Sequence, residues 1–177
     1  TLNPTTNLAS GTEYYVLIDN TAFDDASSNS YVGIASTTAL SFTTNNTPVA
    51  TAPSAPIVNE DDTNVALAAD IDISDADGGD QKLSFKITGG TVTSGTTGIT
   101  FGGSGNSSAS FTALGTLADL NTALDAATFT PTSNLNGTNA GTIAFTSNDG
   151  KDDGNTASIS FDIISVNDTP VISDLDG

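Results

Sequence analysis

The sequence predicts an all-β protein built from tandem antiparallel β-sandwich modules, with one short helix near residues 116–125. Many short runs of β-branched, aromatic and aliphatic residues alternate with Gly-rich and Asn-rich turns, which is typical of a sandwich. A phrase also recurs, as TNNTPV at 44–49 and VNDTPV at 166–171. Repetition over a module-sized interval indicates an array in which each module ends at the same joint.

These observations predict four segments. Residues 1–47 hold only two strand signals, Glu13–Asp19 and Ala39–Thr44, and two strands cannot bury a core. We therefore expect 1–47 to be the C-terminal part of a sandwich module and 48–56 to be a Pro-rich linker. Residues 57–168 are expected to form a complete sandwich, and 169–177 the start of the next module.

Within the complete module we expect eight strands and one helix. The helix is predicted where Leu117, Leu120 and Leu124 share a face, with Thr116 as its cap and Asp119 at the third helical position. The predicted strands are Ile57–Val58, Asn64–Ala68, Leu83–Thr88, Ile99–Phe101, Ser108–Thr112, Ala127–Thr130, Thr142–Thr146 and Ala157–Ile164.

The charge balance excludes several function classes. Lys plus Arg is 3 against 21 for Asp plus Glu, a formal net charge of -18. Nucleic-acid binding needs cations that replace phosphate counterions, and docking on an anionic membrane needs them too. No stretch resembles a membrane span, so no membrane insertion is expected. Cys, Met, Trp and His are all absent, which excludes thiol, imidazole, zinc and haem chemistry.

The segment Ala69–Asp80, ADIDISDADGGD, is the strongest candidate site in the sequence. It places Asp75, Asp77 and Asp80 around two glycines, and a loop of this kind folds oxygen ligands around a hard cation such as Ca²⁺. A metal-free β-turn prefers the same residue types. Further acidic clusters recur at loop positions along the chain, which favours the cation.

Sandwich topology gives these clusters a geometry. The incoming linker, the loop 75–80 and the loop 147–155 should lie at one pole, because successive strands alternate in direction. Glu60 follows the first strand and should lie at the opposite pole, facing the exit joint. The candidate calcium ligands are therefore Asp75, Asp77, Asp80, Asp149, Asp152 and Asn46 at the first pole, and Glu60, Asn167 and Asp168 at the second.

Residues 48–170 resemble cadherin and bacterial cadherin-like repeats. The residues that carry the resemblance are Asn59–Glu60, Asp75 and Asp77, Asp149, the joint Asn167–Pro170, and the phrases Leu117–Pro131 and Asn134–Gly137. The last two phrases resemble the repeats of very large secreted adhesins. The resemblance implies calcium bound at the joints between consecutive modules.

Residues 1–47 resemble the end of bacterial Ig-like repeats of large surface proteins. The matching residues are Leu8, Gly11, Thr12, Tyr14, Val16, Ile18 and Asp19, followed by Ala22, Phe23, Asp25 and Asn29. Together the two resemblances point to RTX-type adhesins and related surface proteins. They imply a secreted, extracellular protein, and a composition rich in Thr, Ser, Asn and Gly agrees with export.

The expected function is structural: an extender module of a long extracellular adhesin, made rigid by Ca²⁺ and partnered by neighbouring modules of the same chain. The alternative is a subunit of a self-assembling filament or surface layer, in which identical chains complete one another head to tail by strand addition. Catalysis is not expected and no catalytic residue is assigned, because carboxylate pairs need a cleft and aromatic platforms.

Overall fold

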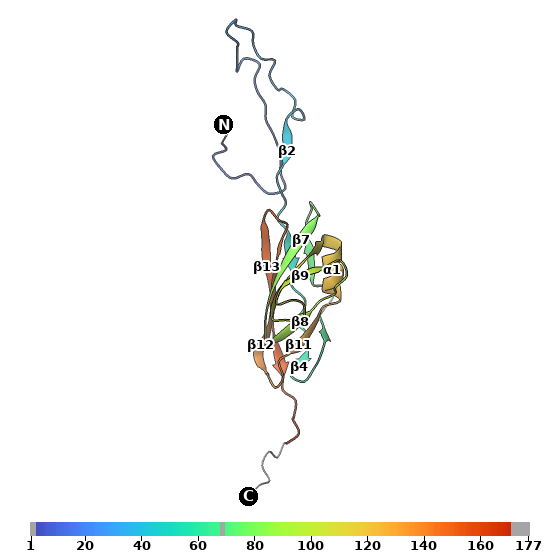
Figure 1. The fold of residues 1–177 in the computed structure, drawn as a ribbon. Coiled ribbons are helices and arrows are strands. Elements are labelled where there is room, and N and C mark those ends of the chain that lie inside the picture. The colour runs from blue at the N-terminus through green and yellow to red at the C-terminus, as the bar shows by residue number, and fades with distance from the viewer. Residues whose placement is uncertain (1–2, 68–69, 171–177) are drawn as a thin grey trace. The chain divides into compact units, whose positions relative to one another are not determined.

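The computed structural model describes residues 3–67 and 70–170 and divides the chain into two units between Thr47 and Pro48 (Figure 1). The division falls where the sequence predicts the first module to end. Most of the expected start of a further module, residues 171–177, lies outside the described residues.

Within residues 3–47, the first unit has one small sheet and no buried core. Strand β1 (Glu13–Tyr15) pairs antiparallel with β2 (Ser41–Thr43), so both expected strands form but are shorter than predicted. Tyr14 stacks on Phe42 with ring centroids 5.9 Å apart. No residue between 3 and 47 is buried, as expected for a pair of strands without a facing layer.

The second unit is a β-sandwich with one short helix (Figure 1). One layer is a six-stranded sheet of β4 (Val58–Asn59), β13 (Asp153–Ile164), β12 (Gly137–Asn148), β7 (Asp80–Thr88), β10 (Ser110–Thr116) and β9 (Thr100–Gly103), in that order. The other layer holds β5 (Val65–Ala66), β11 (Thr128–Pro131) and β8 (Gly90–Thr93), then β3 (Val49–Thr51) with β6 (Asp72–Ser74), and helix α1 (Leu117–Asp125).

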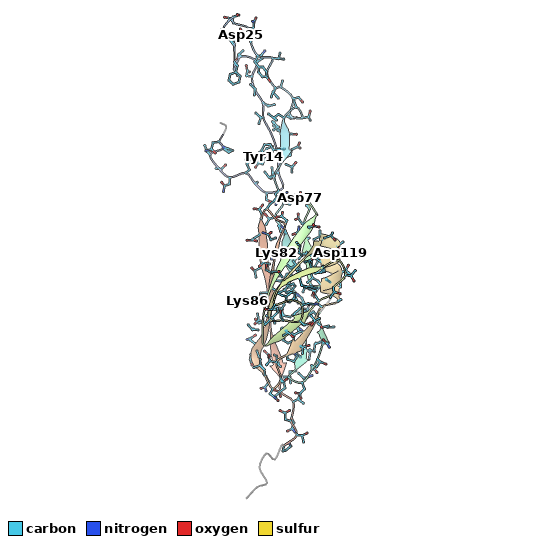
Figure 2. All side chains as sticks on the ribbon, in the orientation of Figure 1. Tyr14, Asp25, Asp77, Lys82, Lys86 and Asp119 are labelled. Carbon is cyan, nitrogen blue, oxygen red and sulfur yellow. The ribbon has the colours of Figure 1, made fainter. Side chains whose placement is uncertain are left out.

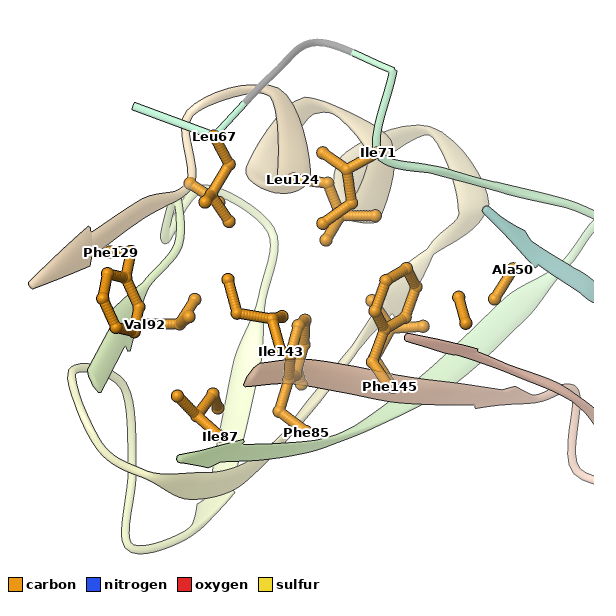
Figure 3. Close-up of a cluster of buried hydrophobic side chains, with 14 of the residues drawn as sticks. Ala50, Leu67, Ile71, Phe85, Ile87, Val92, Leu124, Phe129, Ile143 and Phe145 are labelled. Atoms are coloured by element: carbon orange, nitrogen blue, oxygen red, sulfur yellow. The ribbon is translucent and has the colours of Figure 1, made fainter. Parts of the chain in front are cut away.

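A row of phenylalanines joins the central strands of the large sheet. Phe111, Phe85 and Phe145 are register partners across β10, β7 and β12, and Phe85 stacks on both neighbours at 4.6 and 5.4 Å. Phe129 of β11 meets Phe161 of β13 edge to face at 5.0 Å, which ties the two layers together. Figure 3 shows the core between them. Burial of each ring stabilises the fold by about 2–3 kcal/mol.

The predicted helix and its cap are confirmed. The Thr116 hydroxyl oxygen accepts a hydrogen bond from the Asp119 backbone N–H at 3.1 Å, and the same hydroxyl donates to the Asp119 carboxylate at 2.8 Å. Leu120, Ala123 and Leu124 are buried against the sandwich. The helical spacing of the leucines therefore predicted the packing face correctly.

Three strands, β3, β6 and β8, lie outside the eight that the sequence predicts. Residues 48–56 are predicted as a linker, yet β3 forms there and pairs with β6. Strand β8 forms in a Gly-rich stretch predicted as a turn. A Cβ at Gly90 would lie 2.3 Å from the Thr130 carbonyl oxygen, so this glycine permits close packing within a strand. One pairing also departs from the antiparallel expectation, because β4 runs parallel to β13.

Two asparagine side chains complete the small β3–β6 sheet. Ala50 and Ile73 are opposite each other in its register. Asn155 of β13 accepts from the Ala50 N–H at 2.8 Å and donates to the Ala50 carbonyl at 2.9 Å. Asn121 of α1 makes the same pair of bonds to Ile73, at 3.0 and 2.8 Å. Both edges of this sheet are therefore occupied by amides that act as a further strand would.

After β3 the chain crosses to the other layer and joins β4 beside β13. Asp70 fixes this crossing, because its carboxylate accepts hydrogen bonds from the Ser54 hydroxyl and from the Ser54 backbone N–H. These bonds, the hydroxyl first, lower the pKa of Asp70 below its usual value. Asp70 thus has a structural partner within the fold.

We expect Asn155→Ala and Asn121→Ala each to reduce the free energy of unfolding by about 1–3 kcal/mol, since each leaves a backbone N–H and a carbonyl without their partners. The two losses should not add, because both act on the same pair of short strands. Urea denaturation measures both effects. Thr122→Ala, an exposed neighbour on α1, is the control and should change stability by less than about 0.5 kcal/mol.

Candidate metal sites at the two poles

Three segments meet at one end of the second unit, here called the N-terminal pole: the start of β3, the loop 75–79 and the loop 149–152. The ladders position them, because Asn148 is the register partner of both Lys82 and Asp153, and Ser74 is that of Val49. A Cβ at Gly154 would lie 2.3 Å from the Pro48 carbonyl oxygen. The two predicted loops and the incoming chain therefore lie together, as the sandwich topology predicts.

The loop 75–79 is folded around the Asp75 carboxylate. Its Oδ1 accepts from the Asp77 N–H at 3.0 Å, and its Oδ2 accepts from the Gln81 side-chain amide at 2.7 Å. Gly78 and Gly79 have φ of 66° and 86°, a region that favours glycine. Asp75 thus has the role of a turn-forming residue, which is the alternative that the sequence left open.

The loop 149–152 has the same design. Asp149 Oδ1 accepts from the N–H groups of Lys151 and Asp152, each at 2.8 Å. Asn148 supports the turn by donating to the Asp153 carboxylate at 2.8 Å. Each loop therefore uses one aspartate to fix its own backbone and carries others on the surface.

Asp77, Asp80 and Asp152 are exposed at this pole (Figure 2 labels Asp77). Asp80 opens β7, opposite Thr116 of β10. Asn46, the remaining predicted ligand of this pole, belongs to the first unit. Its participation stays a prediction.

Two buried polar side chains beneath this pole were missed by the sequence analysis. Gln81 and Ser147 are both 0 % exposed, and among the described residues neither Gln81 Oε1 nor Ser147 Oγ has a hydrogen-bond partner. The bond to Asp75 fixes the orientation of the Gln81 amide and so leaves its oxygen as the unpaired atom. Both residues occupy inward positions of alternating strands, and a polar residue at such a position was the signal available in the sequence.

Glu60 is the central residue of the opposite end, here called the C-terminal pole. Its side chain is only 4 % exposed. Oε1 accepts from the Val166 N–H at 2.7 Å, and Oε2 accepts from the Asn136 side-chain amide at 2.5 Å. The Glu60 N–H also donates to the Ile164 carbonyl at 3.0 Å. Glu60 therefore binds the segment that leaves the sandwich, on the side where the sequence places it.

The other groups of this pole are less buried than Glu60. Asp62 Oδ2 accepts from the N–H and the side-chain amide of Asn59, at 2.7 and 3.0 Å. Asn167 donates to the Asp168 carbonyl at 3.2 Å, and both residues are exposed. Asn167 and Asp168 thus follow directly after the backbone N–H that Glu60 holds.

Each pole offers oxygen ligands of the kind that Ca²⁺ prefers, but on separate loops. Within residues 3–67 and 70–170, no group of three or more His, Cys, Asp or Glu side chains is assembled as a metal cage. At the N-terminal pole the available atoms are carboxylate oxygens of the two loops and the Gln81 amide oxygen. At the C-terminal pole the available atoms are the side-chain oxygens of Glu60 and of the exit segment.

The fold places this chain among all-β sandwich proteins with one short helix. No protein-family model, no curated protein and no solved structure matches it. The resemblance to cadherin-like and Ig-like repeats therefore stays a prediction from sequence. In the described part of the chain, no helix is long and apolar enough to cross a membrane.

We expect Asp75→Ala to lower the free energy of unfolding by about 1–3 kcal/mol even in the presence of a chelator, because it leaves the buried Gln81 amide without its acceptor. Chemical denaturation in EDTA measures this. Asp80→Asn, an exposed change beside the same loop, should cost less than about 0.5 kcal/mol. Equal stability of Asp75→Ala and the wild type in EDTA would contradict a metal-independent role for Asp75.

Proposed function

We propose that the second unit is a structural calcium-binding extender module of a long extracellular adhesin or surface protein. One observation carries the proposal: the chain enters the sandwich at one pole and leaves at the other, with carboxylate and amide oxygens at both. Strand β13 spans the distance, from Asp153 beside the incoming β3 to Ile164 beside Glu60. Because the chain enters and leaves at opposite poles, each such module adds its full pole-to-pole length to a chain of modules.

Charge supports a role for cations at the poles. The whole chain has a formal net charge of -18, and the N-terminal pole concentrates Asp75, Asp77, Asp80, Asp149 and Asp152 with Lys151 as the one basic residue in those two loops. Carboxylates of one sign repel each other and destabilise a compact state. A bound Ca²⁺ removes that repulsion and stabilises the folded form by mass action.

Calcium at a pole also restricts the adjoining joint. An ion that takes one ligand from a strand-end loop and another from the joint removes the rotational freedom between them. At the C-terminal pole, Glu60 and Asp62 are the loop ligands, and Asn167 and Asp168 the joint ligands. At the N-terminal pole the loop ligands are those around Asp77. The partners of this module are then its neighbours in the same chain.

The test compares thermal unfolding of the full chain in EDTA, in Ca²⁺ and in Mg²⁺. Calcium at one hundred times its dissociation constant should add about 2.7 kcal/mol to the free energy of unfolding, and magnesium much less. The informative quantity is the difference between calcium and EDTA for each variant, because Asp75 also stabilises the loop without metal.

Asp77→Ala combined with Asp80→Ala should reduce that difference, and Asp72→Ala, on the exposed face of β6, should leave it unchanged. Isothermal titration calorimetry counts the ions directly. A wild-type protein that shows no calcium-specific shift and no heat of binding rules out the extender proposal.

A second candidate rests on the first unit. Its apolar side chains have no layer to pack against within the unit, which is the situation that strand addition from another chain corrects. The exposed side chains are Leu8, Tyr15, Leu17, Phe23, Tyr31, Val32, Leu40 and Phe42. Identical chains that complete one another in this way would form a filament or a surface layer.

Light scattering over a range of protein concentrations tests this second candidate. Assembly should appear as a rise in mass in EDTA as well as in Ca²⁺, and Leu17→Lys with Val32→Lys should abolish it, because both side chains are more than half exposed. Asn20→Lys, a polar position of the same unit, is the charge-matched control. A mass that stays monomeric at every concentration excludes self-assembly through this unit.

A further inference from the structure

Asn136 and Gly137 form the only Asn–Gly pair in the sequence, and they lie at the C-terminal pole. Both residues are exposed, and Gly137 has a φ of 134°. Gly137 opens β12, and the ladder to β13 is irregular between Gly137 and Gly141. The pair therefore sits in accessible backbone that regular strand pairing does not restrain on both sides.

An Asn–Gly pair has a specific chemistry. The Gly137 backbone nitrogen can attack the Asn136 side-chain carbonyl carbon, since glycine has no Cβ to obstruct the approach. A C–N bond forms, the bond to Nδ2 breaks, and ammonia leaves. Water then opens the resulting succinimide ring at either carbonyl and gives aspartate or isoaspartate. The sequence needs no oxidant, reductant or enzyme.

The structure gives this reaction a consequence. The atom that leaves is Nδ2, which donates to Glu60 Oε2 at 2.5 Å. Glu60 is 4 % exposed, and its other oxygen binds the Val166 N–H. After deamidation a new carboxylate replaces the donor and faces the buried carboxylate of Glu60. Two like charges this close repel each other, and the burial of Glu60 limits the water that can screen the repulsion.

We propose that Asn136 is a deamidation site and that its conversion releases the exit segment from the sandwich. Asn136 supplies a donor to Glu60, and Glu60 in turn fixes Val166, the residue before the joint. Repulsion between residue 136 and Glu60 displaces the Glu60 side chain, and the Val166 N–H loses its acceptor. The chain before the joint at Asn167 and Asp168 then loses its last hydrogen bond to the sandwich side chain Glu60.

The first experiment measures the reaction on the full chain. The protein is incubated at pH 8.5 and 37 °C in EDTA, digested, and analysed by mass spectrometry for a gain of about one mass unit and for isoaspartate. Asn136 should convert at least about tenfold faster than Asn134 and Asn139, which lie in the same exposed segment but precede Leu and Ala. Equal rates at the three positions would overturn the proposal.

The second experiment measures the consequence. Asn136→Asp should lower Tm in EDTA by about 5 °C or more, and by more than Asn136→Ser, which removes the amide donor without adding a charge. Glu60→Gln combined with Asn136→Asp should recover most of the loss, because the amide introduced at position 60 can donate to the new carboxylate and still accept from Val166.

A Tm of Asn136→Asp equal to or above that of Asn136→Ser would overturn the coupling to Glu60. If Asn136→Asp does not fold, the double variant decides the matter: recovery of folding supports the proposal, and continued failure contradicts it. Calcium is absent from both experiments, so the result does not depend on the function proposed above.

Discussion

Side-chain amides that complete backbone ladders are the interaction on which the second unit depends. The first part of the module does not form one continuous strand, because β3 lies in one layer and β4 lies in the other. Asn155 and Asn121 supply the bonds that a further neighbouring strand would have made to Ala50 and Ile73. Asn106 does the same for Ser94 beyond the end of β8, through bonds of 2.9 Å to its N–H and carbonyl. A buried backbone group without a hydrogen bond costs more free energy than a formed hydrogen bond contributes. These amides therefore stabilise the packing of the layers around them.

The same principle governs the poles, where aspartates have two roles. Asp75 and Asp149 each fold a loop through hydrogen bonds to backbone N–H groups, and they do so without an ion. Such a loop presents its remaining carboxylates in a defined place, which is the arrangement that the proposed calcium site requires. Gln81 adds an amide oxygen that is buried and lacks a partner among the described residues. The loops therefore have hydrogen bonds of their own that involve no ion.

The sequence predicted the elements whose signals are local. The alternation of Leu83, Phe85 and Ile87 located β7, and Thr116 with Asp119 located the start of α1. It did not predict β3, β6 or β8, because their partners come from distant segments and their own composition resembles a linker, an acidic loop and a turn. The candidate ligands were identified by residue type, and topology placed their loops correctly. Whether an aspartate is engaged by its own backbone depends on torsion angles, which the sequence pattern does not report.

The parallel pairing of β4 with β13 has a consequence for a module under tension. The chain enters at one pole and leaves at the other, so a pull on the two ends draws β4 and β13 in opposite directions along their length. Parallel neighbours loaded in this way resist by shear, with the bonds of Ile163 and Ile164 strained together rather than opened one by one. Glu60 extends the loaded zone by its bond to Val166. The mechanical strength of the sandwich is thus concentrated in a few residues at the pole from which the chain departs.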